Sequence, residues 1–352
     1  MYPLFIILCS ALCSLSLAHA DVGFRQITLQ PHSPRPVNAS FWYPTDAKGT
    51  VEIIGENAAF YGEQVLRNAK PTTNSHPLLL LSHGYGGSWR NLNWLATAMA
   101  KQGYIVAAPD HPGTTTDNHS PQAAQQLWLR PKDIDHVLDV LLSNSQLAGK
   151  IDDSRIAAVG HSLGGWTVLK LAGGQFSSPD FINDCKLRSQ HSDCQLIETL
   201  GIANIASQRW LDSSQRNLHI KAVVLLDLGL ARGFTPASLA KINVPVLVLS
   251  AQDDSPNLPA SMESGYLAEY LPSNMVSYTR IRGATHFSFM QRCKPNAAAL
   301  IDTFSPGEGI ICSDQGTLHR AAIHQDIINR IIPFLSGALN LATGETGSAS
   351  SR

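Results

Sequence analysis

The chain has 352 residues, of which 44% are hydrophobic and 15% charged, and its formal net charge is -1 at pH 7. A chain of this length and apolar content can bury a sizeable core, as one large domain or two smaller ones. Composition therefore excludes a disordered or fibrous protein. Because the charge is nearly balanced, the chain offers no broad attraction for nucleic acid or an anionic membrane. We expect a small, largely uncharged partner, with no nucleic-acid binding and no stable membrane insertion.

Residues 1–20 are predicted to form a signal peptide. Residues 4–17 are apolar, and Ala-His-Ala at 18–20 matches the small-residue pattern of a cleavage site. An N-terminal membrane anchor is the alternative, which we disfavour because the apolar run is short for a spanning helix of about 20 residues. Cleavage after Ala20 predicts a secreted or periplasmic protein.

Two kinds of hydrophobic pattern follow. Residues 23–30 and 37–43 alternate apolar and polar side chains, which is typical of antiparallel strands at a sheet edge. Further strands are expected at residues 78–82, 104–108, 155–160, 220–227, 244–250 and 276–281, and helices at 91–101, 131–142, 163–172 and 259–270. Strands that alternate with helices predict an α/β fold, with a mainly parallel sheet covered by helices on both faces.

Residues 175–218 interrupt this alternation with polar clusters where a short connection is expected. We interpret this segment as a small cap inserted into the sheet domain, which would span residues 21–342. The tail at 343–352 is polar and built of small residues, so we expect it to be disordered.

The cysteines predict disulfides. The chain has 6 cysteines, and removal of residues 1–20 would leave four, an even number in an oxidising compartment. Sequence alone permits three connectivities, of which we favour the local pairs Cys185 with Cys194 and Cys293 with Cys312. A zinc site is the less favoured alternative, because neither pair has a short C-x-x-C spacing.

Residues 160–164 read Gly-His-Ser-Leu-Gly and match G-x-S-x-G between a predicted strand and a predicted helix. In this context the serine occupies a strained turn that lifts its hydroxyl above the sheet edge, and glycines avoid collisions with the neighbouring elements. We therefore predict Ser162 as a nucleophile. The helix N-terminus and the Leu163 amide would face the position of an oxyanion. A chance match in a glycine-rich turn is the alternative.

A second glycine-rich loop, Ser-His-Gly-Tyr-Gly-Gly at 82–87, follows an earlier strand. Loops at this position supply the other oxyanion amide, so we assign that role to the Tyr85 N–H. The Tyr85 ring is a candidate for one wall of an acyl pocket. A plain turn is the alternative. The aromatic residues Trp89, Trp166 and Phe287 lie close in sequence to these loops and are candidates for an apolar pocket, although buried aromatics are more often core.

His286 is the predicted general base, because it lies in a short loop after the last strand and an imidazole titrates near neutral pH. Among the 13 histidines, His286 is chosen because it follows the last predicted strand. His83, His111 and His161 flank the same loops, and we interpret them as pocket or packing residues without a catalytic part.

The acid partner has two candidates, because Asp227 and Asp254 each follow a predicted strand and both satisfy the order Ser, Asp, His. We favour Asp254, which follows the strand before the histidine strand and has Asp253 beside it. One helix and one strand fit between Asp254 and His286, so their loops should emerge side by side. Any of these carboxylates could instead cap a helix or turn.

The motifs at 82–87, 160–165 and 283–287 (Gly-Ala-Thr-His-Phe) occur in one chain in that order. On these motifs the mature sequence resembles bacterial proteins described as dienelactone hydrolases, a group similar to platelet-activating-factor acetylhydrolases and, more distantly, to polyester-degrading cutinases. The resemblance implies an α/β-hydrolase fold and serine esterase or lipase chemistry on short-chain acyl esters, through an acyl-enzyme and without metal or organic cofactor. True dienelactone hydrolases have a cysteine where this chain has Ser162.

The resemblance leaves some choices open. The acetylhydrolases carry their acid after the strand that here ends in Asp227, whereas the cutinases carry it after the strand that here precedes Asp254. The inserted segment 175–218 is absent from the cutinases. An acyltransferase or peptidase would use the same triad, and a catalytically silent binding protein could keep the fold, although the presence of nucleophile, base and acids speaks against it.

Overall fold

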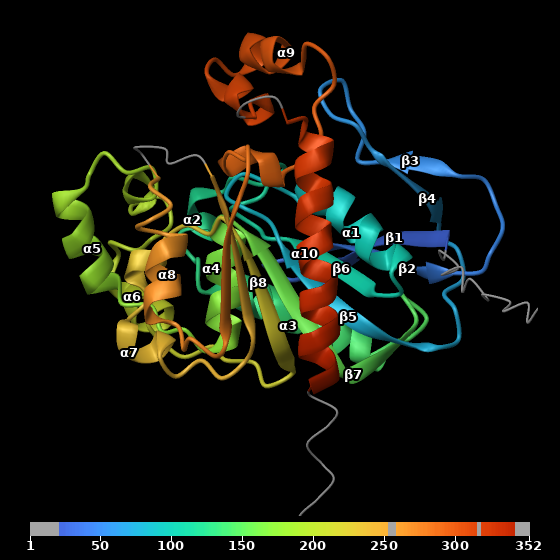
Figure 1. Cartoon of the computed structure of the whole chain (residues 1–352), viewed down its shortest axis with the longest axis horizontal. Coiled ribbons are helices and arrows are strands. Elements are labelled where there is room, and N and C mark those ends of the chain that lie inside the picture. Colours follow the sequence, from blue (N-terminus) through green and yellow to red (C-terminus); the bar gives the residue numbers. More distant parts are fainter. Residues whose placement is uncertain (1–20, 253–257, 315–317, 342–352) are drawn as a thin grey trace, which may run out of the picture.

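A ten-stranded mixed sheet forms the centre of the computed structural model, which describes residues 21–252, 258–314 and 318–341 (Figure 1). The strands are β1 (Asp21–Leu29), β2 (Val37–Thr45), β3 (Glu52–Ile54), β4 (Glu63–Arg67), β5 (Ser75–Ser82), β6 (Ile105–Asp110), β7 (Lys150–His161), β8 (Ile220–Leu226), β9 (Val246–Ala251) and β10 (Val276–Ile281). Their order across the sheet is β10-β9-β8-β7-β5-β6-β2-β1-β4-β3.

The part of the sheet from β6 to β10 is parallel throughout. Strand β2 pairs antiparallel with β6, and β1 pairs antiparallel with β2. The predicted α/β fold with a mainly parallel sheet is therefore confirmed. Because parallel strands end at the same edge, the loops after β5, β7, β8 and β10 gather there, and these loops carry Tyr85, Ser162, Asp227 and His286.

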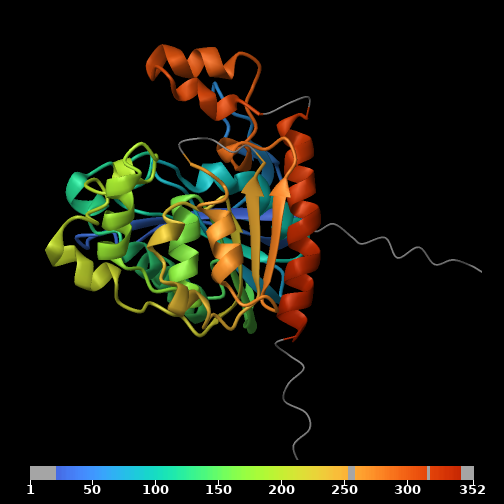
Figure 2. The ribbon, with the colours of Figure 1, turned by 60° about the vertical axis from the view of Figure 1, so that its left-hand side comes forward.

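Helices cover both faces of the sheet (Figure 2). One face packs against α1 (Asn93–Lys101) and α10 (Arg320–Leu341), and the other against α3 (Leu129–Ser143), α4 (Leu163–Ala172) and α8 (Ser264–Tyr270). Apolar side chains of the strands alternate between the two resulting cores, as the two-residue period of a strand requires. The shorter helices are η1 (Trp89–Leu92), α2 (Pro121–Ala124), η3 (Ala231–Gly233), α7 (Pro236–Leu239) and η4 (His286–Phe289).

The helix α10 was not among the predicted elements. Its side chains Ile323, Ile327, Ile331 and Leu335 recur every four residues and are all buried, which is the spacing of one helix face against a core. Among the described residues, no helix combines the length and hydropathy needed to cross a bilayer. The predicted signal peptide and tail, residues 1–20 and 343–352, lie outside the described ranges.

The predicted cap segment contains α5 (Ser178–Leu187), η2 (Cys194–Leu196) and α6 (Ile205–Leu211). Buried ion pairs connect it to the sheet domain: Arg232 in η3 donates to Asp184 at 2.7 Å and to Asp193 at 3.0 Å, both in the cap, and also pairs with Glu263 of the domain. Arg232 is 8% exposed and Glu263 is 3% exposed. Breaking a buried charge cluster of this kind is costly, so these contacts hold the cap against the domain.

A second excursion follows His286 and was not predicted. It consists of α9 (Ala297–Phe304) and η5 (Glu308–Cys312), and it projects beyond the sheet edge at the top of Figure 1. The helix α9 makes most of its close contacts with η5. The excursion therefore has a small packing unit of its own above the carboxyl edge of the sheet.

Both predicted disulfides, Cys185–Cys194 and Cys293–Cys312, are present. The first lies in the cap and the second joins the two ends of the α9–η5 excursion. Within the described ranges, the one side-chain group with metal-ligand spacing is Asp184 with Cys185 and Cys194. Because these two sulfurs are bonded to each other, the group has no thiolate for a metal.

We expect replacement of either cysteine pair by serine to lower the free energy of unfolding by about 3 kcal/mol, because each disulfide restricts the unfolded chain. Urea titration of both double variants under non-reducing conditions measures this. The wild type treated with reductant is the control. A change below about 0.5 kcal/mol, which is the scale of ordinary surface substitutions, would contradict the expectation.

Candidate active site

Ser162 lies on a sharp turn between β7 and α4, with φ +54° and ψ -121°. A positive φ of this kind is unfavourable for a serine. The flanking glycines make the turn possible: a Cβ on Gly160 would lie 2.0 Å from the Gly164 carbonyl oxygen, and a Cβ on Gly164 would lie 1.9 Å from the Ser82 carbonyl oxygen. The G-x-S-x-G pattern is therefore required by close packing of strand, turn and helix.

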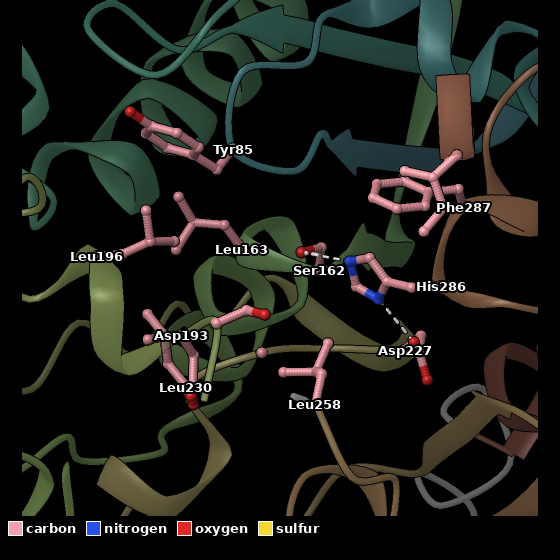
Figure 3. A pocket seen from close by; sticks show the side chains of 13 residues that line it. Tyr85, Ser162, Leu163, Asp193, Leu196, Asp227, Leu230, Leu258, His286 and Phe287 are labelled. Carbon is pink, nitrogen blue, oxygen red and sulfur yellow. Dashed lines mark hydrogen bonds and ion pairs between the residues drawn. The ribbon is translucent and has the colours of Figure 1, made fainter. Parts of the chain in front are cut away.

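The three polar side chains Ser162, His286 and Asp227 form one hydrogen-bonded row (Figure 3). The Ser162 hydroxyl lies 3.0 Å from His286 Nε2, and His286 Nδ1–H donates to Asp227 Oδ2 at 2.6 Å. The other Asp227 oxygen accepts the Ala251 N–H at 2.8 Å. Asp227 is thus held at both oxygens, and the bond to Nδ1 leaves Nε2 free to accept a proton.

The favoured acid, Asp254, lies among residues 253–257, outside the described residues. Within the described residues, His286 Nδ1 is bonded to Asp227, the alternative acid, and the choice between the two acids stays a prediction. The contact with Asp227 follows from the strand order, because β9 and β8 lie between the histidine strand β10 and the serine strand β7. The His286 loop must reach back over the end of β8, and this brings the imidazole to Asp227.

The Tyr85 and Leu163 N–H groups have no hydrogen-bond partner among the described residues. Leu163 is the first residue of α4, where an amide has no partner within the helix. The loop of Tyr85 lies against Ser162, since a Cβ on Gly84 would be 3.2 Å from Ser162 Cβ. Two free donors near one hydroxyl are the arrangement that stabilises an oxyanion.

His161 has a partner that the sequence did not predict. Its Nε2–H donates to the His286 carbonyl oxygen at 2.9 Å. Burial, followed by the charge of His286, lowers the pKa of His161 to about 3, so the ring is neutral near pH 7. His161 thereby fixes the backbone of His286, the predicted base.

Two cavities meet at Ser162, and both are also lined by Tyr85, His286 and Phe287. The smaller has a volume of about 360 Å³ and extends toward the cap, where Leu196, Leu230 and Leu258 form an aliphatic wall beside the polar Asp193 (Figure 3). Ser192 and Ile310 of η5 also line it. We call it the cap chamber. The larger, of about 670 Å³, lies under the α9–η5 excursion, and we call it the excursion chamber. Its lining mixes apolar with polar side chains: Met290, Ile301 and Ile311 with Asn91, Thr116, His119, Ser305 and Glu308.

Two of the three aromatic residues expected in the pocket lie elsewhere. Trp166 is fully buried and packs edge-on against Phe176, and Trp89 packs against Phe24 and Trp42. Neither lines the two chambers, so this expectation is corrected. Trp166 lies one helical turn beyond Ser162 and faces the core, because only the first residues of α4 reach the site. Phe287 does line both chambers.

A serine on a strand-turn-helix elbow at the carboxyl edge of a parallel sheet, bonded to a histidine that bonds an aspartate, defines the α/β-hydrolase fold with a Ser-His-Asp arrangement. The chain therefore has the α/β-hydrolase fold. A solved structure, "Ferulic acid esterase from Streptomyces cinnamoneus", agrees, with a TM-score of 0.62 over 91% of both chains at 20% identity. At this identity the likeness concerns the fold alone.

The family model matches the first half of the domain, and two curated relatives match parts of the chain. Residues 32–178 match the family model described as PET hydrolase-like. Cutinase 2 of Thermobifida cellulosilytica is 32% identical over 140 residues, which cover 37% of this chain and 50% of that protein. Platelet-activating factor acetylhydrolase of Cavia porcellus is 27% identical over 140 residues, covering 28% of this chain and 32% of that protein.

The matched part thus spans half or less of these curated relatives. The expected resemblance to esterases of the cutinase and acetylhydrolase kind is confirmed. The matched region 32–178 contains the Tyr85 loop and the Ser162 elbow, whereas His286, both candidate acids and the two excursions lie beyond it.

Proposed function

We propose that the protein is a serine carboxylic-ester hydrolase for short-chain acyl esters, with Ser162 as nucleophile, His286 as general base and Asp227 as the acid. The observation that carries the proposal is the hydrogen-bonded row Ser162–His286–Asp227. The Tyr85 and Leu163 amides, which have no partner in the part of the chain that the structure describes, lie on the two loops next to it. The relatives named cutinase and acetylhydrolase support ester chemistry.

In the proposed acylation step, Ser162 Oγ attacks the ester carbonyl carbon while its proton passes to His286 Nε2. The carbonyl oxygen becomes an oxyanion, which accepts hydrogen bonds from the Tyr85 and Leu163 amides. When the tetrahedral intermediate collapses, the bond to the alcohol oxygen breaks and His286 returns the proton to the leaving alcohol. Asp227 keeps the proton on Nδ1 and stabilises the imidazolium.

Deacylation repeats these steps with water as the attacking group. Water gives a proton to His286 Nε2 and adds to the acyl carbon, and the second intermediate releases the carboxylic acid as Ser162 Oγ regains its proton. No step requires a group other than the residues named and water.

The proposed mechanism is tested by turnover of p-nitrophenyl acetate and by a fluorophosphonate probe. We expect the wild type to hydrolyse the ester and to carry the probe on Ser162 alone, as located by peptide mass spectrometry. Labelling at another residue would show that Ser162 is not the nucleophile. Labelling without turnover of any simple ester would favour the silent binding protein, and transfer to added alcohol or amine in preference to water would favour an acyltransferase.

The cap chamber supports the short-chain substrate. The aliphatic wall of Leu196, Leu230 and Leu258 suits an acyl chain, and the larger excursion chamber leaves room for the alcohol. We expect Leu196→Trp, which fills part of the cap chamber, to lower kcat/KM for p-nitrophenyl butyrate about tenfold, within the range that pocket size controls.

The same Leu196→Trp variant should change kcat/KM for p-nitrophenyl acetate less than about threefold, because an acetyl group needs little of the chamber. Leu187→Trp is the matched control, since Leu187 also lies in the cap but is 79% exposed and lines neither chamber. Equal losses on acetate and butyrate would contradict the placement of the acyl chain.

Export is part of the proposal. The two disulfides support an oxidising compartment, in agreement with the predicted signal peptide. Mass spectrometry of protein recovered from the periplasm or medium should give a mature N-terminus at Asp21. A full-length chain that stays in the membrane fraction would favour the membrane anchor.

A further inference from the structure

The Gly84–Tyr85 peptide is held from its carbonyl side. The Gly84 oxygen accepts a hydrogen bond from His83 Nδ1 at 2.7 Å and a second from the Gly87 N–H at 3.2 Å. A trans peptide is planar, and its C=O and N–H point in opposite directions. The two bonds on the Gly84 oxygen therefore determine the direction of the Tyr85 N–H, one of the two proposed oxyanion donors.

The tautomer of His83 is fixed by its other nitrogen. His83 Nε2 accepts the His111 N–H at 3.0 Å, so the ring proton must be on Nδ1, where it reaches the Gly84 oxygen. The ring is 2% exposed. Burial, and to a smaller extent the nearby charge of Arg130, holds the pKa of His83 well below its ordinary value. The ring is therefore neutral, and Nε2 remains an acceptor.

Arg130 of α3 supports the loop around this peptide. It is 1% exposed, and it donates to the His83 carbonyl oxygen and to Thr114 Oγ1, the latter at 2.5 Å. The Thr114 carbonyl oxygen in turn accepts the Gly86 N–H at 2.9 Å. The His83–Gly84 and Tyr85–Gly86 peptides are thus bonded to buried polar groups. The His83 ring bonds the peptide between them, Gly84–Tyr85.

We infer that His83 is a positioning residue, which aims and strengthens the Tyr85 N–H without touching substrate. The inference rests on the proposed ester chemistry. A bond to a peptide oxygen polarises the peptide and makes its N–H a better donor. Because the donor acts on the oxyanion and only weakly on the ground-state ester, loss of the His83 bond lowers kcat more than it raises KM.

A pair of near-isosteric variants separates the two nitrogens of the ring. His83→Asn can place an amide N–H where Nδ1 lies and keeps the bond to the Gly84 oxygen. His83→Gln reaches the Nε2 position, accepts the His111 N–H and leaves the Gly84 oxygen without its side-chain donor. We expect kcat on p-nitrophenyl butyrate to fall about 100-fold in His83→Gln, the scale of one lost oxyanion donor, and less than about fivefold in His83→Asn.

Binding of a trifluoromethyl ketone, whose adduct with Ser162 carries an oxyanion, should weaken in His83→Gln by the same factor as kcat, with KM within about threefold. A merely structural role would lower the melting temperature and the fraction of active sites, while kcat per titrated site stayed constant.

Equal losses in the two variants, or a folded His83→Gln with kcat within about threefold of wild type, would overturn the inference. Should His83→Gln fail to fold, a 100-fold loss in His83→Asn would overturn it and near-wild-type kcat would support it.

Phosphonylation by the fluorophosphonate separates this inference from the proposed function. The reaction places a phosphoryl oxygen in the same oxyanion position but requires no ester turnover. If the wild type reacts with the probe and hydrolyses no ester, the proposed function fails, and the ratio of phosphonylation rates between the two variants still tests His83. Equal rates in both variants, or a wild type inert to the probe, would overturn the positioning role.

Discussion

Ser162→Ala is expected to fold like the wild type and to lose ester hydrolysis by about 10⁵-fold or more, because the amides of Tyr85 and Leu163 remain but have no nucleophile to assist. The substitution removes one hydroxyl from the elbow and keeps the Cβ and the flanking glycines. Since the Ser162 side chain bonds only to His286 among the described residues, little stability depends on it. Steady-state hydrolysis of p-nitrophenyl acetate, with thermal unfolding measured in parallel, checks both expectations.

Ser189→Ala is the matched control for this variant. Ser189 is an exposed serine of the cap segment that lines neither chamber, so its kcat should stay within about threefold of wild type. A folded, carefully purified Ser162→Ala protein that keeps a substantial part of the wild-type activity would refute the proposed mechanism.

Asp227→Asn is expected to lower kcat by about 10⁴-fold with little change in folding. The backbone explains why the loss should be so large. Ala251 N–H donates to one carboxylate oxygen at 2.8 Å, so the amide oxygen of asparagine is retained on that side and its NH₂ group faces His286 Nδ1. The imidazole must then present an unprotonated Nδ1 and a protonated Nε2, and that tautomer cannot take the proton from Ser162.

Asp254→Asn is the comparison that decides between the two acids. We expect its kcat to stay within about tenfold of wild type, a difference near 1.4 kcal/mol in the activation free energy. The reverse result, with a large loss in Asp254→Asn and a small one in Asp227→Asn, would support Asp254, the acid that the sequence favours, and contradict the proposed role of Asp227.

The sheet was largely predictable because its central strands are short apolar runs between helices. Strand β10 and helix α4 have the predicted limits, whereas β3 and β4 were missed because they are only 3 and 5 residues long. Such short segments show little periodicity. The helix α10 contains Pro333, a residue that argues against a helix interior in a sequence, and this obscures its four-residue apolar spacing.

Within the site, the residues set by local motifs were predictable and those set by chain path were not. Ser162 and Tyr85 lie on turns whose glycines are visible in the sequence. Which described carboxylate contacts His286 depends on the strand end that the His286 loop crosses, and no local pattern encodes that path. The roles of His83 and His161 depend on single bonds to backbone oxygens, and such bonds leave no periodic signal.

The α9–η5 excursion leaves and rejoins the domain at Cys293 and Cys312, whose Cα atoms lie 5.7 Å apart. That separation is within the span of one β-turn, which is under about 7 Å. The excursion is therefore an exchangeable module: a four-residue turn could close the same gap, and a different loop could be grafted there. Because Ser162, His286 and Asp227 all lie outside it, evolution or an engineer can remodel the excursion chamber while the reacting groups keep their positions.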